Sequence, residues 1–185
     1  SDPGHNTLGR FSFTMRTFFI ADPHFGHKAV IEYENRPFAS VEEMDEALIA
    51  NWNNTVTKHD IVWLLGDVTL STKKEYIKYI FSRLKGNIRL IKGNHDTRSD
   101  DFYRECGCAF VSRYPVILKD FFILSHAPLY KRFKAPYFNI YGHVHGNDNF
   151  VTRTENSWCV SVERQDYRPI QIPQYDDYVI RTGDE

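Results

Sequence analysis

The sequence predicts an α/β fold, and three observations support this prediction. The chain has 185 residues, of which 42% are hydrophobic, enough to bury the core of one domain. In the first half, short apolar runs typical of buried strands alternate with segments of helical periodicity. In the second half, strand-like runs predominate. This pattern predicts a central sheet region with helices outside it, and leaves open whether there is one sheet or two sheets packed together.

Three apolar runs in the first half are expected to be strands, with helices between them. The expected strands cover residues 17–21, 61–65 and 88–91. Ser40 and Glu43 form a capping-box pattern, so a helix is expected to begin there. The buried face of this helix would carry apolar residues at helical spacing, namely Val41, Met44, Ala47, Leu48 and Trp52.

A second long helix is expected between Ser71, as its cap, and Gly86, where the chain would leave it. Its buried face would consist of Tyr76, Ile77, Ile80, Phe81 and Leu84. Shorter helical segments are expected at residues 28–33 and 100–105.

The second half is expected to contain short strands. Residues 116–118 and 121–124 flank Lys119-Asp120 and predict a hairpin. Further strands are expected near residues 139–141, 158–162 and 170–172.

The chain is expected to form a single domain over residues 15–185, because no internal repeat or linker is visible. Residues 1–14 are rich in Gly, Ser and Asn and show no periodicity. We expect them to be a tail, either a remnant of expression or an upstream extension.

Composition excludes several classes of function. The net charge is −1, so the chain has no global basic field for nucleic acid, although a local patch would still allow such a substrate. The three cysteines, Cys106, Cys108 and Cys159, do not suit a disulfide framework and indicate thiols in a reducing compartment. No apolar run is long enough to span a bilayer and no secretory signal is visible, so we expect a soluble cytoplasmic protein.

Polar side chains of metal-binding type follow five apolar runs at the points where the expected strands end. Each run ends in a small residue, and the blocks that carry these side chains are Asp22-Pro23-His24, Gly66-Asp67, Gly93-Asn94-His95-Asp96, Ser125-His126 and Gly142-His143-Val144-His145. Asn, His and Asp are poor strand formers, so their repetition at strand ends indicates one converging site at the edge of a sheet.

The types of ligand in these blocks indicate two metal ions. The candidates are Asp22, His24, Asp67, Asn94, His126, His143 and His145. This set is too large for one tetrahedral ion and about right for two ions that share a bridge. Mixed nitrogen and oxygen ligands suit manganese first, with iron, zinc, cobalt or nickel as alternatives, whereas Ca²⁺ or Mg²⁺ alone is disfavoured. In Asp-x-His and His-x-His, an extended backbone would turn both side chains towards one ion.

These five blocks, in this order, resemble the signature of the calcineurin-like metallophosphoesterases. The segment Phe25-Gly26-His27, continuing to Tyr33 and Arg36-Pro37-Phe38, is similar to a small bacterial and phage branch of that superfamily. The resemblance implies a four-layer αββα sandwich of two mixed sheets flanked by helices.

The resemblance also implies the role of each residue. Asp22, His24, Asp67 and His145 would hold one metal, and Asp67, Asn94, His126 and His143 would hold the second. His95 would contact the phosphate and assist the leaving group, and Asp96 would orient His95. The implied reaction is hydrolysis of a phosphodiester or phosphomonoester by a hydroxide that the two metals activate.

The expected substrate is a small phosphate ester, and a nucleotide is among the candidates. Asn94, His95, His27, Arg98 and Arg36 are candidate substrate contacts, although the last three would equally suit ordinary loop positions. The sequence leaves two alternatives open: a nuclease on single-stranded nucleic acid and a non-catalytic interaction scaffold. The nuclease rests on residues 130–137, which interleave basic and aromatic groups. Monomer and homodimer are both compatible with the sequence.

Overall fold

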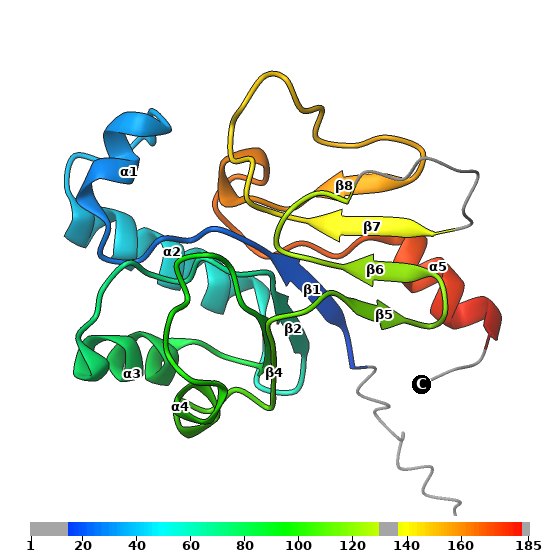
Figure 1. The fold of residues 1–185 in the computed structure, drawn as a ribbon, viewed down its shortest axis with the longest axis horizontal. Helices are drawn as coiled ribbons and strands as arrows, with labels where there is room; N and C mark the ends of the chain where they lie inside the picture. Colours follow the sequence, from blue (N-terminus) through cyan, green and yellow to red (C-terminus); the bar gives the residue numbers. More distant parts are fainter. Residues whose placement is uncertain (1–14, 130–136, 183–185) are drawn as a thin grey trace, which may run out of the picture.

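Two four-stranded sheets form the centre of the protein (Figure 1). The computed structural model describes residues 15–129 and 137–182, with the side chains up to residue 177. The first sheet has the order β1 (Thr17–Ile20), β2 (Ile61–Leu64), β3 (Asn87–Ile91), β4 (Phe110–Ser112). The second sheet has the order β5 (Val116–Leu118), β6 (Phe122–Leu124), β7 (Phe138–Tyr141), β8 (Ser157–Cys159).

The first sheet is parallel throughout, and the second is mixed because β5 runs antiparallel to β6. In Figure 1 the helices α1 to α4 gather on the side of the first sheet that faces away from the second sheet. The helices are α1 (Lys28–Tyr33), α2 (Val41–Thr55), α3 (Lys74–Arg83), α4 (Asp100–Glu105), the 3₁₀ helix η1 (Val162–Arg164) and α5 (Pro173–Thr182). This two-sheet α/β sandwich with flanking helices is the expected fold class.

Alternation along β1 explains why residues 18–21 are apolar without interruption. On β1, Phe18 and Ile20 pack into the core beneath the helices. Phe19 and the adjoining Ala21 pack into the core between the two sheets. Successive residues of a strand point to opposite faces, so a stretch of strand that is buried on both faces carries apolar residues at successive positions.

Several of the predicted elements are confirmed. Ser40 caps α2, because its hydroxyl accepts a hydrogen bond from the Glu43 amide at 3.1 Å. The hairpin of β5 and β6 is present, with Ile117 opposite Ile123. The predicted helices at residues 28–33 and 100–105 have those bounds.

Other predicted elements were wrong or incomplete. Ser71 does not cap α3, because its hydroxyl accepts from the Lys73 amide in a turn that precedes the helix. The strand expected over residues 158–162 ends at Cys159, and Val162 begins η1. Near residues 170–172 the pairing amounts to a single bridge between Ile170 and Phe19.

Besides η1, the elements β4 and α5 were not predicted. Strand β4 has three residues, too few to show a period. Helix α5 begins at Pro173, and its Tyr175 ring packs 5.3 Å from Phe19 and 5.1 Å from Phe122, measured between ring centroids. In the part of the chain that the structure describes, no helix is both long and apolar enough to cross a membrane.

Candidate metal centre

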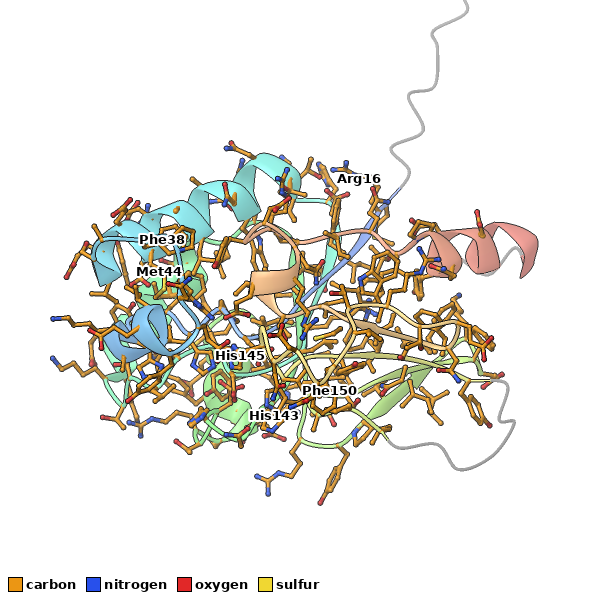
Figure 2. All side chains as sticks on the ribbon, turned by 90° about the horizontal axis from the view of Figure 1, so that it is seen from above. Arg16, Phe38, Met44, His143, His145 and Phe150 are labelled. Carbon is orange, nitrogen blue, oxygen red and sulfur yellow. The ribbon has the colours of Figure 1, made fainter. Side chains whose placement is uncertain are left out.

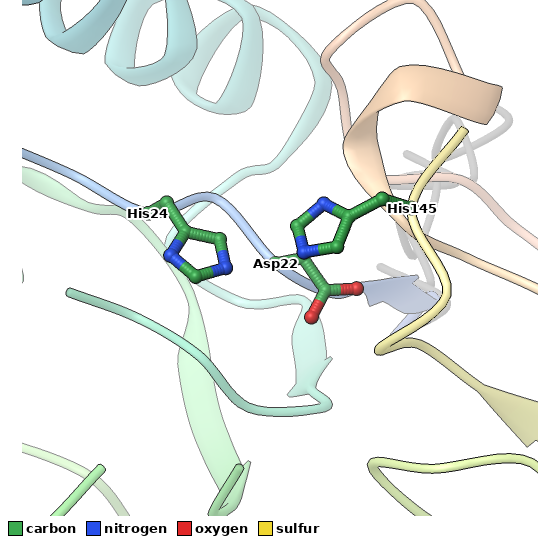
Figure 3. A group of neighbouring side chains, drawn as sticks. All are labelled: Asp22, His24 and His145. Atoms are coloured by element: carbon green, nitrogen blue, oxygen red, sulfur yellow. The ribbon is translucent and has the colours of Figure 1, made fainter. Parts of the chain in front are cut away.

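Six of the predicted ligands form two clusters at the ends of strands from both sheets. Asp22, His24 and His145 form the first group, shown in Figure 3. The second group consists of Asp67, His126 and His143. Within each group the potential ligand atoms lie within 4.8 Å of one another. The seventh residue, Asn94, lies against the second group, with its Oδ1 3.0 Å from His126 Nε2.

Five of these residues have a left-handed backbone. Their φ angles are +59° at Asp22, +52° at His24, +54° at Asp67, +73° at His143 and +47° at His145. Non-glycine residues rarely adopt positive φ, and such strain tends to gather at functional sites. The expected extended backbone of Asp-x-His and His-x-His was therefore wrong, because tight left-handed turns aim these side chains instead.

Two glycines allow the turns to approach one another. A Cβ atom on Gly93 would lie 2.2 Å from Asp67 Oδ1, and one on Gly142 would lie 2.6 Å from Asp22 Oδ2. Both contacts are shorter than any side chain tolerates. At Gly93 and Gly142, the absence of a side chain is therefore a steric requirement of the site.

The first group is buried and its polar atoms are poorly paired. Asp22 is 0% exposed and His24 is 3% exposed. Asp22 Oδ2 accepts from the His143 amide at 2.8 Å and from the Ser161 hydroxyl at 2.6 Å. Among the described residues, no hydrogen-bond partner reaches Asp22 Oδ1 or either ring nitrogen of His24. Burial raises the pKa of Asp22 to about 6 and lowers that of His24 to about 3.

These orphaned atoms fit a bound cation. An unpaired buried polar group is costly, and a carboxylate oxygen with imidazole nitrogens is a donor set that divalent transition metals accept. The nearest charged neighbours are too distant for hydrogen bonds, at 3.6 Å from His24 Nε2 to Asp67 Oδ2 and 3.8 Å from Asp22 Oδ1 to His126 Nδ1. The residues present therefore suit a metal ion.

The second group is more open and its members pair with one another. His126 Nδ1 lies 2.8 Å from the Leu65 carbonyl, which holds a proton on that nitrogen. His126 Nε2 lies 3.0 Å from His143 Nδ1 and 3.4 Å from Asp67 Oδ2. Burial alone would raise the pKa of Asp67, but the adjacent His126 holds it at about 2. Burial alone would lower the pKa of His126, but the hydrogen bond to Asp67 and the nearby carboxylates raise it to about 9.

His95 lies between the two groups. Its side chain is 42% exposed, its Nε2 lies 3.9 Å from Asp67 Oδ2, and its ring centroid lies 5.6 Å from that of His24. The imidazole can therefore meet a molecule that arrives from solvent and contacts both groups.

Asp96 does not orient the His95 ring, so that prediction was wrong. Its carboxylate accepts from the backbone amides of Asp67 at 2.8 Å, Gly93 at 2.8 Å and Val68 at 3.1 Å. Burial raises its pKa to about 6 in spite of these bonds. Asp96 thus fastens the turn after β2 to the turn after β3.

Arg36 is also misassigned as a substrate contact. Its side chain is 0% exposed, and the guanidinium donates to the backbone carbonyls of Asp22 and Pro23, each at 2.8 Å. It also pairs with Glu163, at 2.5 Å from Nη2 to Oε1. A buried guanidinium with these partners cannot reach a substrate.

The remaining candidates differ in position. His27 lies near the first group, with ring centroids 5.4 Å apart for His27 and His24. Arg98 donates to the Thr72 carbonyl, on the loop before α3, and among the described residues its side chain makes no hydrogen bond to a candidate ligand. Most of the predicted basic and aromatic segment, residues 130–136, lies outside the described residues.

Glu163 is a residue of the site that sequence analysis missed. Its Oε1 lies 2.9 Å from His145 Nδ1. No motif surrounds it, and it reaches the site because Ser161 forms a parallel bridge with Ala21 at the end of β1. Burial alone would raise the pKa of Glu163, but His145 and Arg36 lower it.

Two depressions flank the centre. One, of about 350 Å³, is lined by Lys92, Gly93, Asn94, Asp96, Thr97 and Arg113. The other, of about 510 Å³, is lined by Glu34, Ala127, Pro128, His143, Val144, His145, Asn147 and Phe150. Figure 2 labels three residues of this second depression, His143, His145 and Phe150, which lie close together.

Comparison with known proteins identifies the family. The family model of calcineurin-like phosphoesterases matches residues 15–180, which include every ligand candidate. The chain belongs to the calcineurin-like phosphoesterase family. This family is metal-dependent, and membership supports a metal-dependent phosphoesterase activity in general.

Proteins similar to this chain include archaeal and phage proteins. An uncharacterized protein of Methanocaldococcus jannaschii is 36% identical over 85% of this chain and 87% of its own length. The gene 66 protein of Mycobacterium phage L5 is 42% identical over 43% of this chain and 39% of the phage protein. A solved protein of unknown function from Aquifex aeolicus superimposes with a TM-score of 0.68 at 24% identity, over 89% of this chain and 99% of that chain. The last similarity concerns the fold alone.

Proposed function

We propose that this calcineurin-like phosphoesterase hydrolyses a small phosphodiester with two divalent metal ions, and that a phosphomonoester is the next candidate. The observation that carries the proposal is the meeting of two ligand groups around Asp67. Asp67 Oδ2 lies 3.6 Å from His24 Nε2 and 3.4 Å from His126 Nε2, so one carboxylate faces imidazoles of both groups. A shared carboxylate is what a two-ion site needs.

In the proposal, each ion takes four ligands. The first ion would be held by Asp22, His24, Asp67 and His145, and the second by Asp67, Asn94, His126 and His143. Manganese is the first candidate, because these are hard and borderline donors without a thiolate. Iron, zinc, cobalt and nickel suit the same donors.

The residues of the chain would contribute binding and proton transfer. When bound, the ions would neutralise charge on the phosphoryl oxygens and make water acidic enough to supply a nucleophile. His95 would donate a proton to the leaving alkoxide, since its exposed imidazole lies beside the bridging carboxylate. Asp96 would keep His95 in place indirectly, because it fastens the turn that carries His95.

The depressions favour a substrate with two unlike substituents. Phe150 and Val144 offer apolar surface in the depression next to His143, and Glu34 can accept hydrogen bonds from hydroxyl or amino groups. Arg113 lines the other depression, beside Asn94, and would suit an anionic group. A nucleotide phosphodiester carries such groups, so short nucleotides are our first candidates.

A nuclease that acts on single-stranded nucleic acid is the second candidate. Arg113 beside Asn94 favours it, because a polynucleotide would place a neighbouring phosphate there. A non-catalytic scaffold is not proposed, because the seven candidate ligands lie in two neighbouring groups and His95 lies beside Asp67, which supports a catalytic role. The free thiols of Cys106, Cys108 and Cys159 support a reducing cytoplasmic location.

The test uses metal-stripped protein reloaded with Mn²⁺ and assayed on bis-p-nitrophenyl phosphate and p-nitrophenyl phosphate. We expect turnover of the diester to exceed turnover of the monoester and to require added metal. Preference for the monoester would redirect the search to small phosphate metabolites. Failure to turn over either compound, with two ions bound per chain, would contradict the proposal.

A further inference from the structure

A buried ion pair behind the first group contacts two of its three members. It consists of Glu163, on η1, and Arg36, on the loop between α1 and α2. Neither residue is among the seven candidate ligands, and their side chains are 6% and 0% exposed. Their position suggests that they act through the ligands rather than on the substrate.

The contact of Glu163 fixes which nitrogen of His145 can bind a metal. Glu163 Oε1 lies 2.9 Å from His145 Nδ1, so that nitrogen carries a proton and donates a hydrogen bond to the carboxylate. The lone pair of His145 is then on Nε2. Such a carboxylate also restricts rotation of the ring and makes the imidazole a better donor to metal.

Arg36 connects this carboxylate to the other side of the first group. Its Nε and Nη2 lie 2.9 Å and 2.5 Å from Glu163 Oε1. Its Nη2 and Nη1 also donate to the carbonyls of Asp22 and Pro23, each at 2.8 Å. One buried guanidinium therefore sets the distance between the turn that carries Asp22 and the carboxylate that orients His145.

We propose that Glu163 is a positioning residue that orients His145 for the first metal ion. Arg36 would hold Glu163 at a fixed distance from the turn that carries Asp22. This inference rests on the proposed function, because it assumes that the first group binds a metal.

Direct ligation by Glu163 is the alternative, and the contacts argue against it. Potential ligand atoms of Glu34, His145 and Glu163 also lie within 4.8 Å of one another. However, Glu163 Oε1 already accepts from His145 and from two nitrogens of Arg36. Its Oε2 is buried and has no hydrogen-bond partner among the described residues, so the His145 ring decides between the two roles. The carboxylate faces Nδ1, and an ion on Nε2 would lie on the opposite side of the imidazole. Glu34 accepts from the Gly146 amide at 3.2 Å and makes no hydrogen bond with the His145 ring in the described structure.

The test compares Glu163→Gln with Glu34→Gln by calorimetric titration of metal-stripped protein with Mn²⁺. Each variant loses one negative charge near His145, but only the first alters the partner of the imidazole. We expect Glu163→Gln to bind one of its two ions about 10–100-fold more weakly and to leave the other unchanged. Glu34→Gln is expected to bind both ions as the wild type does.

A second variant covers the case in which Glu163→Gln does not fold. The pair Arg36→Met with Glu163→Gln removes both buried charges, so neither is left uncompensated. Circular dichroism would check its fold, and the same loss at one ion is expected. A third readout is nitrogen NMR of histidine in Zn²⁺-loaded protein, where protonation of Nδ1 of His145 is expected in the wild type and its resonance should shift in Glu163→Gln.

The outcomes separate this inference from the proposed function. Wild-type protein that binds fewer than two ions would contradict the proposed function itself. If the wild type binds two ions and the folded variants bind both equally well, the positioning role is wrong. Equal weakening of both ions, or equal loss in Glu34→Gln, would also overturn it, because charge alone would then explain the effect.

Discussion

The two ligand groups use similar residues but differ in how their polar atoms are paired. In the first group Asp22 Oδ1 and both ring nitrogens of His24 have no hydrogen-bond partner in the described structure. In the second group His126 and Asp67 are paired with each other, and Asn94 and His143 also contact His126. A bound cation would therefore satisfy polar atoms of the first group that are otherwise unpaired, whereas the members of the second group satisfy one another.

The difference also appears in proton affinity. Burial raises the pKa of Asp22 to about 6, whereas the adjacent imidazole of His126 overcomes burial and holds that of Asp67 at about 2. Two carboxylates that serve one centre thus have opposite effects on stability when metal is absent. In the metal-free protein, the free-energy cost of holding ionised carboxylates at this centre therefore comes mainly from Asp22.

The largest expected effect tests whether the two groups serve one reaction. His95 faces both groups, so His95→Ala should lower kcat by about 10²–10⁴-fold through loss of proton transfer to the leaving group. Steady-state kinetics with the diester, together with metal analysis, would measure this. Binding of both ions should stay at the wild-type level, and a kcat within a few-fold of wild type would contradict the role.

The next effect concerns the support of the first group. Arg36→Met leaves the buried carboxylate of Glu163 without its cationic partner, which typically costs about 3–5 kcal/mol. The free energy of unfolding, from urea titration, should fall by that amount. The control is Arg168→Met, because Arg168 and its partner Asp166 are 54% and 85% exposed and such pairs contribute about 0–1 kcal/mol. Equal losses in both variants would show that the first group has no special support.

A third effect should have opposite signs in the two groups. The pKa of Asp22 is raised from 3.8 to about 6, so its contribution to stability is present below about pH 4 and is lost as pH rises through about 6. Metal-free Asp22→Asn should therefore be more stable than wild type at pH 7, by up to about 3 kcal/mol, with no gain at pH 4. The amide oxygen can still accept the hydrogen bonds from His143 and Ser161.

Asp67→Asn is the matched control, because its effect on the free energy of unfolding should have the opposite sign. The pKa of Asp67 is lowered from 3.8 to about 2, so its contribution is present above about pH 4 and is lost as pH falls through about 2. Metal-free Asp67→Asn should lose up to about 2 kcal/mol at pH 7. Urea titration with and without Mn²⁺ would test both variants, and added metal should reverse the advantage of Asp22→Asn. The same sign in both variants would remove the contrast between the groups.

The smallest expected effect lies at the exposed end of the second group. His143 is exposed and has φ +73°, which asparagine tolerates, so His143→Asn should change metal-free stability by no more than about 0.5 kcal/mol. His126→Asn should cost about 1–3 kcal/mol, because it leaves the buried Leu65 carbonyl unpaired. Thermal unfolding of the two variants side by side would check the ranking, and a loss at His143 as large as at His126 would refute it.

Sequence analysis found the ligand candidates because they are local features. Each lies in a block after an apolar run, and parallel strands bring such blocks to one edge. Asp96 was misread because adjacency in sequence was taken for contact, although its carboxylate binds the amides of other turns. The fold class followed from periodicity, but β4 and α5 were too short or too weakly patterned to predict.

Tertiary structure supplied what the sequence could not. Glu163 reaches His145 through the bridge between Ser161 and Ala21, a contact between residues far apart in the chain. Arg36 was taken for a substrate contact because a loop arginine beside a motif shows no sign of its burial. Residues that support a ligand have no fixed spacing from it, so pattern analysis does not find them.

The left-handed turns of the five ligand residues bear on how such a site can be lost. Glycine adopts positive φ freely, so a change to glycine at any of them would remove a ligand and relieve the backbone together. Selection for stability alone would then replace these candidate ligands before it changed the residues of the sheets. In a relative that has abandoned catalysis, we expect the strands to persist and glycine or asparagine to occupy these turns. Aspartate and histidine would remain only while the chemistry is in use.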